Sequence, residues 1–206
     1  MSSAAQAEER PQSAAGATAT IAVLLVAAFV VILNETVLNV ALPHIMEDMS
    51  VSAATVQWVT TSFMLTMAVV IPTTGFLLQR FSTRAVFALA MGSFALGTLL
   101  AAVTPSFGVL ILARVVQAFG SAIMLPLLMT TILMLVPRQR RGVVMGNVSI
   151  VISVAPALGP TLSGLILAHF PWRTIFWFVL PIALLALAIG LLRLKDVSER
   201  GTLRLD

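Results

Sequence analysis

Six apolar stretches follow one another along this 206-residue chain, and each is long enough to cross a lipid bilayer as a helix, which takes about 20 residues. They cover residues 21–42, 56–78, 85–103, 107–136, 142–168 and 174–192. Only 10% of the residues are charged, whereas a soluble domain carries about 25%. The pattern predicts an all-α membrane protein: a bundle of six transmembrane helices at residues 21–192, between a disordered cytoplasmic tail at 1–20 and a cytoplasmic tail at 193–206.

The distribution of basic residues predicts how the bundle is oriented. Lysine and arginine gather in the two tails and in the second and fourth loops, whereas the other side carries only Arg173. The basic residues of the first side are Arg10, Arg80, Arg84, Arg138, Arg140, Arg141, Arg193, Lys195, Arg200 and Arg204. Because basic loops stay in the cytoplasm, both termini are predicted to be cytoplasmic, in a multi-pass protein of the cell inner (plasma) membrane. Three tryptophans, Trp58, Trp172 and Trp177, fall near the predicted outer interface, where indole rings prefer to lie.

Several classes of function are not indicated. The net charge of +4 does not point to nucleic acid, because the charges lie in loops between apolar stretches. There is no cysteine, and the two histidines, His44 and His169, fall at predicted helix ends without a metal-binding pattern. Neither the buried nucleophile–base pair of an intramembrane hydrolase nor a phosphate-binding glycine loop is found. We therefore expect no cofactor and no enzymatic activity.

The first apolar stretch contains an ionisable side chain, Glu35. A carboxylate in hydrocarbon costs at least ~2.5 kcal/mol, which indicates a functional group that faces a cavity or a partner. At 3.6 residues per turn, Glu35 and Asn39 share one helix face, and Asn34 lies about 100° around the helix. The alternative is a tolerated glutamate that reaches the interface from near the helix end.

The fourth apolar stretch contains the second buried charge, Arg114, with Gln117 and Ser121 on the same helix face. Counted at 1.5 Å per residue, Glu35 and Arg114 both lie about 10 Å below the outer ends of their helices. The two charges are therefore predicted to pair, directly or through water. The alternative is a structural arginine that bonds carbonyl groups of the first helix. Both charges occupy the first helix of a three-helix unit, as in transporters built from repeats.

The fifth apolar stretch combines small residues with two prolines. The small residues recur near helical spacing at Gly142, Gly146, Ser149, Ser153 and Ala157, a stripe that lets helix backbones approach closely. Pro156 and Pro160 each remove a backbone hydrogen bond and are expected to bend the helix. Two interpretations of this stretch are possible: it serves close packing alone, or it is a bent helix that seals or hinges a pathway. The second loop contains two arginines, Arg80 and Arg84. They either only set the orientation of the chain in the membrane or also belong to a cytoplasmic gate.

Four segments, in order and on the expected helices, resemble motifs of drug:proton antiporters in the major facilitator superfamily, in the fourteen-spanner branch. Residues 34–43 resemble the first-helix motif, and residues 75–84 resemble the motif of loop 2–3. Residues 114–120 resemble the fourth-helix motif, and residues 155–164 the antiporter motif of the fifth helix. The sequence Leu-Asn-Glu-Thr that starts at Leu33 is similar to the corresponding sequence of lincomycin-resistance-type exporters.

The resemblance implies the N-terminal half of a major facilitator fold, with a 3+3 helix repeat, in a multidrug efflux transporter that exchanges small amphipathic drug-like substrates for protons. It implies proton coupling through Glu35 and Arg114, and a substrate cavity with Asn34, Asn39 and Gln117. The implied gating or packing positions are Gly75, Arg80, Arg84, Gly120, Pro156, Gly159, Pro160 and Gly164.

The sequence departs from the family pattern at five positions. Two of them are Ala155 and Ser163, small residues that replace glycines of the antiporter motif. In the loop motif, Gln79 stands where the family has an acidic residue, and Ser82 stands where it has a glycine. In the first helix, Asn34 occupies the usual aspartate position, and the acidic residue, Glu35, follows one position later. Transporters of this kind have twelve or fourteen spans. Besides the lipid bilayer, the expected partner is therefore a missing C-terminal half or a second copy. The alternative function is a truncated, non-transporting membrane bundle that packs with a partner.

Overall fold

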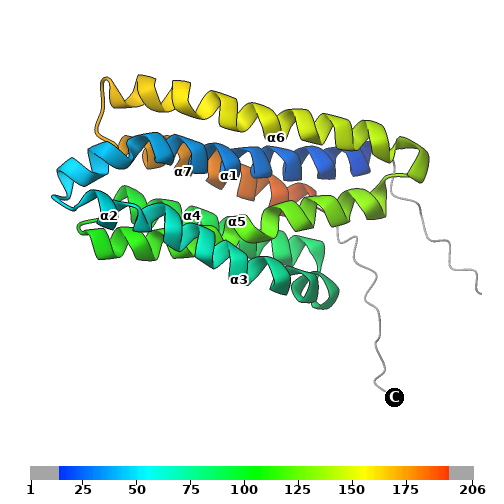
Figure 1. The fold of residues 1–206 in the computed structure, drawn as a ribbon. Coiled ribbons are helices and arrows are strands. Elements are labelled where there is room, and N and C mark those ends of the chain that lie inside the picture. The colour runs from blue at the N-terminus through cyan, green and yellow to red at the C-terminus, as the bar shows by residue number, and fades with distance from the viewer. Residues whose placement is uncertain (1–13, 195–206) are drawn as a thin grey trace, which may run out of the picture.

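The computed structural model describes residues 14–194, which form helices joined by short loops (Figure 1). The helices are α1 (Ala14–Asp48), α2 (Ala53–Val56), α3 (Trp58–Arg80), α4 (Thr83–Ala102), α5 (Phe107–Leu135), α6 (Arg138–Leu167) and α7 (Thr174–Arg193). With α2 and α3 counted as one span, six are long and apolar enough to cross a membrane. Because no strand occurs between residues 14 and 194, the predicted all-α, six-span class is confirmed.

Helix α1 is longer than predicted at both ends. It already begins at Ala14, and it continues through Pro43 to Asp48, so the predicted end at residue 42, directly before this proline, is wrong. A proline inside a helix removes one backbone hydrogen bond. Ile45 is fully buried just beyond it, and the packing of this last turn offsets that loss. The rest of the predicted tail at 1–20, and the tail at 193–206 after its first two positions, lie outside the described residues.

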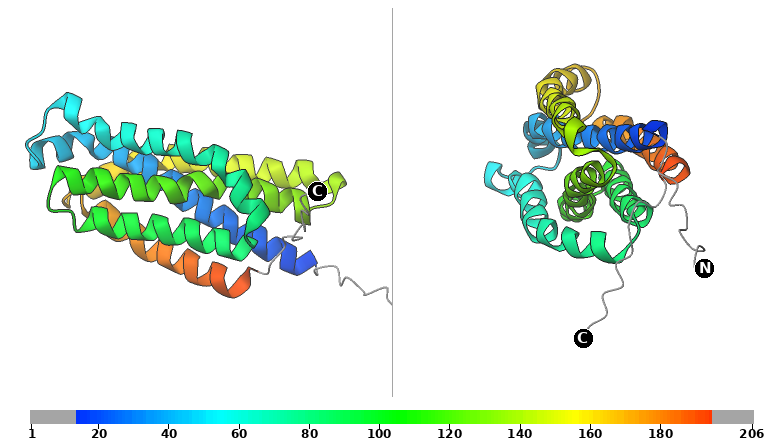
Figure 2. Two further views of the ribbon diagram at one scale, coloured as in Figure 1. Left: turned by 90° about the horizontal axis from the view of Figure 1, so that it is seen from below. Right: turned by 90° about the vertical axis from the view of Figure 1, so that its right-hand side faces the viewer.

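The helices pack as two interlocked three-helix units, the first formed by α1, α2–α3 and α4 and the second by α5, α6 and α7. Helix α1 packs mainly against α6 and α7, and α5 packs mainly against α3 and α4. The first helix of each unit therefore lies against the second and third helices of the other unit, as the end-on view of Figure 2 shows. The third helices, α4 and α7, also pack together. This exchange agrees with the predicted 3+3 repeat.

The loops alternate between the two ends of the bundle (Figure 1). The start of α1, the α3–α4 and α5–α6 loops and the end of α7 lie at one end, which we call the arginine end. Its charged residues, within the described range, are Arg80, Arg84, Arg138, Arg140, Arg141 and Arg193. The opposite end carries Glu47, Asp48 and Arg173. The fold thus gathers the basic loops at one end, as the charge pattern predicts.

Arg173 connects three segments at the opposite end. Its Nη1 donates to Asp48 Oδ2 at 2.6 Å, while its Nε and Nη2 donate to the carbonyl of Thr104 at 3.4 and 3.3 Å. The Trp172 indole donates to the same Asp48 oxygen at 3.1 Å, and its ring lies 4.4 Å beneath the Arg173 guanidinium. Trp172 is only 3% exposed, so it is a packing residue and not the interface indole that its position predicts. Trp58 and Trp177 are exposed, as predicted.

We expect Arg173→Ala to lower the melting temperature of the purified protein in detergent more than Asp48→Asn does. The alanine removes the bonds that Arg173 makes to Asp48 and to the Thr104 carbonyl. The asparagine keeps an acceptor for Trp172 and costs about 0–1 kcal/mol, as the loss of an exposed ion pair does. Arg84→Ala is the matched control, because Arg84 is exposed at the arginine end. An equal loss in all three variants would show that the Arg173 contacts do not hold these segments together.

Candidate functional site

A layer of buried polar side chains crosses the middle of the bundle. One apolar cluster fills the arginine end and includes Val31 on α1 and Ala122 on α5. A second cluster fills the opposite end and includes Val37 and Ala113 on the same helices. Between the clusters lie Asn34, Ser62, Thr98, Arg114, Gln117 and Ser121, all buried, which we call the polar layer. Polar groups at this depth need partners inside the protein, because hydrocarbon provides none.

Arg114 is the charged centre of the polar layer and is 1% exposed. Its Nε donates to the carbonyl of Val59 on α3 at 3.2 Å, and its Nη1 donates to Gln117 Oε1 at 2.9 Å. The guanidinium also lies 4.0 Å from the centre of the Phe63 ring, where the face of the ring attracts a cation. Arg114 is therefore held by α3 and by its own helix. The structural alternative expected Arg114 to bond carbonyl groups of the first helix, whereas the carbonyl that it bonds belongs to α3.

Gln117 extends these contacts to a third helix. Its Nε2 donates to Thr98 Oγ1 at 2.9 Å, and the Thr98 hydroxyl donates to the carbonyl of Phe94 in its own helix at 2.7 Å. The chain of bonds thus joins α3, α5 and α4. Gly120, one turn beyond Gln117, makes this close packing possible, because a Cβ at that position would collide with the carbonyl of Ala90. Gly120 is a packing position in this structure.

Glu35 lies on α1 and is partly buried. Its side chain makes no hydrogen bond or ion pair with any described residue, and the expected direct pairing with Arg114 is not present. The reason is geometric: the guanidinium of Arg114 is turned toward α3, whereas Glu35 lies on α1. The two charges still attract each other through the interior. A buried positive charge that is held by two hydrogen bonds thus lies within electrostatic reach of a carboxylate that has none among the described residues.

The remaining predicted cavity residues differ in their surroundings. Asn34 is completely buried, and neither its Oδ1 nor its Nδ2 has a hydrogen-bond partner within the described residues. The buried hydroxyl of Ser62 is likewise unpartnered. Asn39 is exposed, and its Oδ1 accepts a bond of 3.1 Å from Thr60 on α3. Gln117 accepts from Arg114 and donates to Thr98, and its role in a substrate cavity stays a prediction.

Helix α6 packs on α1 through a face beside the stripe of small residues. The stripe Gly142, Gly146, Ser149, Ser153 and Ala157 is exposed, so it does not pack within this bundle. The contact runs instead through Ala155, Gly159 and Ser163, which are all buried. A Cβ on Gly159 would collide with the hydroxyl of Thr36, and Ser163 Oγ donates to the carbonyl of Val37 at 2.9 Å. Two stripes lie side by side on one helix, and sequence spacing alone does not tell them apart.

The other predicted gating positions lie away from the polar layer. Pro156, Pro160 and Gly164 are exposed on α6. Gly75 is exposed near the end of α3, and no atom lies within 4 Å of where its Cβ would be. Arg80 lies 5.8 Å above the Phe76 ring, and Arg84 is exposed in the first turn of α4. A gating role for these residues stays a prediction.

We expect Gly159→Ala to destabilise the protein by about 1–3 kcal/mol, the usual cost of overpacking, because its methyl group has to displace Thr36. The melting temperature of the purified protein in detergent measures the effect. Gly164→Ala is the matched control on the same helix, since nothing lies within 4 Å of its Cβ position. A Gly159→Ala protein as stable as this control would contradict the packing argument.

Comparisons with known proteins agree with this architecture. The family model described as Major Facilitator Superfamily matches residues 24–204. In Bacillus subtilis (strain 168), the uncharacterised MFS-type transporter YcnB is 46% identical over 186 residues, which cover 90% of this chain and 39% of that protein. The lincomycin resistance protein LmrB of the same organism is 45% identical over 183 residues, covering 89% of this chain and 38% of that protein. The chain spans about two-fifths of the length of these curated relatives.

The fold is also that of solved transporters. The crystal structure of the human organic anion transporter MFSD10 superposes with a TM-score of 0.75, at 17% identity, over 89% of this chain and 49% of that one. The bundle described above therefore corresponds to one half of such a transporter, and the relatives are transporters rather than enzymes. The chain belongs to the major facilitator superfamily.

Proposed function

We propose that the protein containing this chain is a proton-coupled exporter that exchanges small amphipathic drug molecules for protons. The observation that carries the proposal is Glu35, a carboxylate inside a membrane span with no ion-pair or hydrogen-bond partner in the described part of the chain. A carboxylate at this depth is costly unless it is neutralised. A proton or a cationic substrate neutralises it equally well, and competition between the two couples their movements.

Arg114 supports this role by providing a fixed positive charge. A guanidinium stays protonated in proteins, and three groups hold it in place: the Val59 carbonyl, the Gln117 amide and the Phe63 ring. It attracts the ionised form of Glu35 without being consumed by a direct salt bridge. The carboxylate is therefore able to release its proton and to take one up again.

Asn34 is the residue that we propose as a polar contact for substrate. Its amide is buried beside Glu35 with both the donor and the acceptor unpartnered among the described residues. A buried amide without partners costs about 1–3 kcal/mol, so a polar group of a bound molecule, or a water, stabilises it. The name of the relative LmrB, a lincomycin resistance protein, supports drug-like substrates for this chain.

A second candidate is a bundle that does not transport but packs against a partner. It is favoured by the exposed row of small residues on α6, Gly142, Gly146, Ser149, Ser153 and Ala157, against which another helix can pack closely. The same row also suits a further half of a transporter or a second copy of this chain. Transport measurements distinguish the two functions.

We also propose that the arginine end faces the cytoplasm, since basic loops are retained there. In this cysteine-free chain, Gln79→Cys and Ser106→Cys place single thiols at exposed positions at opposite ends. An impermeant maleimide added to intact cells should label the Ser106→Cys protein alone. Ser82 is avoided because its hydroxyl accepts a bond from the Ala85 amide at the start of α4. Labelling of Gln79→Cys from outside would reverse the orientation.

Glu35→Gln is expected to abolish ethidium efflux driven by a pH gradient in inverted membrane vesicles, while expression remains normal. Glutamine keeps the size and hydrogen bonding of the side chain but does not exchange a proton. The readout is the rate of dye movement as a function of the imposed pH difference.

Two variants control this measurement. Glu47→Gln removes a carboxylate from the exposed end of the same helix and should leave efflux unchanged. Glu35→Asp keeps an exchangeable carboxylate and should retain part of the activity. Gradient-driven efflux that survives in Glu35→Gln would remove the proposed mechanism, and absence of efflux in the unmodified protein would favour the second candidate.

A further inference from the structure

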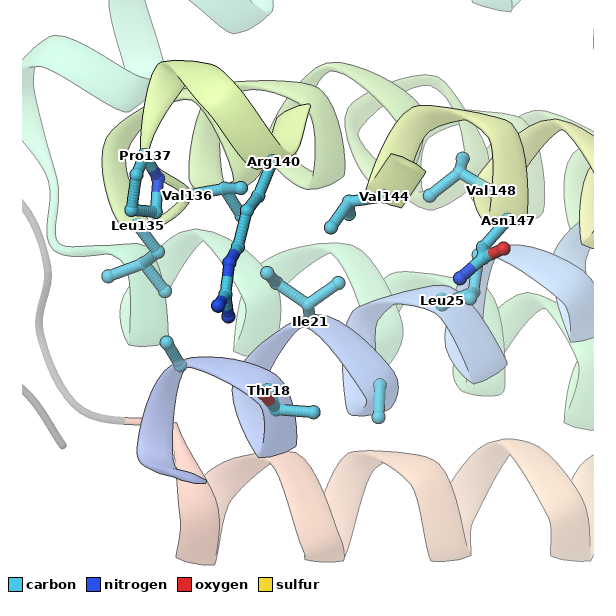
Figure 3. A pocket seen from close by; sticks show the side chains of 12 residues that line it. Thr18, Ile21, Leu25, Leu135, Val136, Pro137, Arg140, Val144, Asn147 and Val148 are labelled. Carbon is cyan, nitrogen blue, oxygen red and sulfur yellow. The ribbon is translucent and has the colours of Figure 1, made fainter. Parts of the chain in front are cut away.

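A groove at the arginine end is separate from the polar layer. It lies between the first turns of α1, the end of α5 and the start of α6, with a volume of about 400 Å³ (Figure 3). Its walls are mainly aliphatic, with Ile21 and Leu25 on α1 facing Val144 and Val148 on α6. Ala22 and Thr18 are exposed, so the groove opens at the surface of the bundle. Pockets of about 300–1,000 Å³ hold small ligands, so the groove has room for part of an acyl chain.

One end of the groove carries a positive charge. The side chain of Arg140 extends from α6 toward α1, and its guanidinium lies near Thr18 (Figure 3). Its neighbour Arg141 is used differently: Nε and Nη2 donate to the carbonyls of Val136 and Leu133 at 2.9 and 2.6 Å, which caps the end of α5. Arg140 makes no such bond within the described part of the chain. Every described charged residue at this end is an arginine, so nothing described there neutralises it.

The depth of the groove matches the border between lipid head groups and hydrocarbon. Helix α1 has 35 residues and is about 52 Å long at 1.5 Å per residue, whereas the hydrocarbon core is about 30 Å thick. Its terminal turns therefore lie in the interfacial zone. Arg140 and Thr18 lie at the end of the groove nearest the tip of the arginine end, and Leu25 and Val148 lie deeper in the bundle. The charged part is thus at head-group level and the aliphatic part at acyl-chain level.

We propose that this groove binds one anionic phospholipid of the surrounding leaflet, with the phosphate on Arg140 and an acyl chain along Ile21, Leu25, Val144 and Val148. Charge complementarity selects the head group, since basic pockets between membrane helices bind anionic lipids. Asn147, which also lines the groove, adds a hydrogen-bonding amide beside the acyl chain region. With the arginine end in the cytoplasm, the lipid comes from the inner leaflet, where anionic lipids attract basic residues.

Native mass spectrometry of the delipidated protein tests the proposal with two lipids of equal chains, dioleoyl phosphatidylglycerol and dioleoyl phosphatidylcholine. We expect one phosphatidylglycerol to be retained in preference to phosphatidylcholine. Arg140→Gln should weaken phosphatidylglycerol binding about fivefold, the effect of one basic residue at an anionic surface. Ala22→Phe, which fills the groove from its exposed side, should weaken the binding of both lipids.

Arg138→Gln is the matched control, because it removes the same charge from the same helix at an exposed position outside the groove. Equal losses in Arg138→Gln and Arg140→Gln would show nonspecific attraction and overturn the proposal. So would unchanged binding in both Arg140→Gln and Ala22→Phe. Soluble glycerol 3-phosphate should not compete, and full displacement by it would identify a free-phosphate site instead of a lipid site.

Discussion

An arginine inside an apolar bundle needs hydrogen-bond partners within the protein, because hydrocarbon supplies none. Arg114 finds them in the Val59 carbonyl on α3 and in Gln117 on its own helix, and Gln117 in turn reaches Thr98 on α4. This single requirement fixes how α3, α4 and α5 lie relative to one another at mid-depth. The glycine at position 120 follows from it, since α4 and α5 have to approach closely for the chain of bonds to close.

The two charges inside the bundle differ in how completely they are satisfied. Arg114 is held by two hydrogen bonds and by the face of the Phe63 ring, which suits a permanent source of positive potential. Glu35 has no partner in the described residues, and next to it the amide of Asn34 is equally unpartnered. A site that exchanges protons and substrate needs this combination, because a carboxylate locked in a salt bridge has little reason to accept either. Arg114 is thus the fixed charge of the bundle, and Glu35 is the charge without a partner among the described residues.

Much of the fold follows from the sequence because hydrocarbon leaves few choices. The lengths of the apolar stretches predict six helices. The positions of the basic loops predict that Arg80, Arg138 and their neighbours lie at one end of the bundle. Helix ends are less determined, because Pro43 costs only one hydrogen bond and the burial of Ile45 overrides it. The face that α6 turns toward α1 is undetermined in the sequence for a related reason. Small residues occur on two adjacent faces, and only the contact of Gly159 with Thr36 shows which one packs inside the bundle.

The sequence identifies the charged residues of the site, but it does not show which residues they contact. A charge within an apolar stretch marks Glu35 and Arg114 from the sequence alone. Equal depth, however, does not determine which neighbour a side chain faces, and a rotation about the helix axis sends Arg114 to α3. Thr98 and Phe63 had no distinguishing signal, since a threonine or a phenylalanine in an apolar span ordinarily reads as packing. Their positions opposite Gln117 and Arg114 become evident only when three helices are placed together.

The repeat explains why the two first helices carry different chemistry. In it α5 corresponds to α1 and α3 corresponds to α6, so the α3–α5 contact is the counterpart of the α6–α1 contact. The first is filled by the guanidinium of Arg114, which reaches a carbonyl of α3. The second is closed by Gly159 against Thr36 and by the Ser163 hydroxyl on the Val37 carbonyl, with no room for a charged side chain. Glu35, adjacent to Thr36, points about 100° away around α1 and stays outside that contact. The same backbone arrangement therefore immobilises the arginine and leaves the carboxylate available.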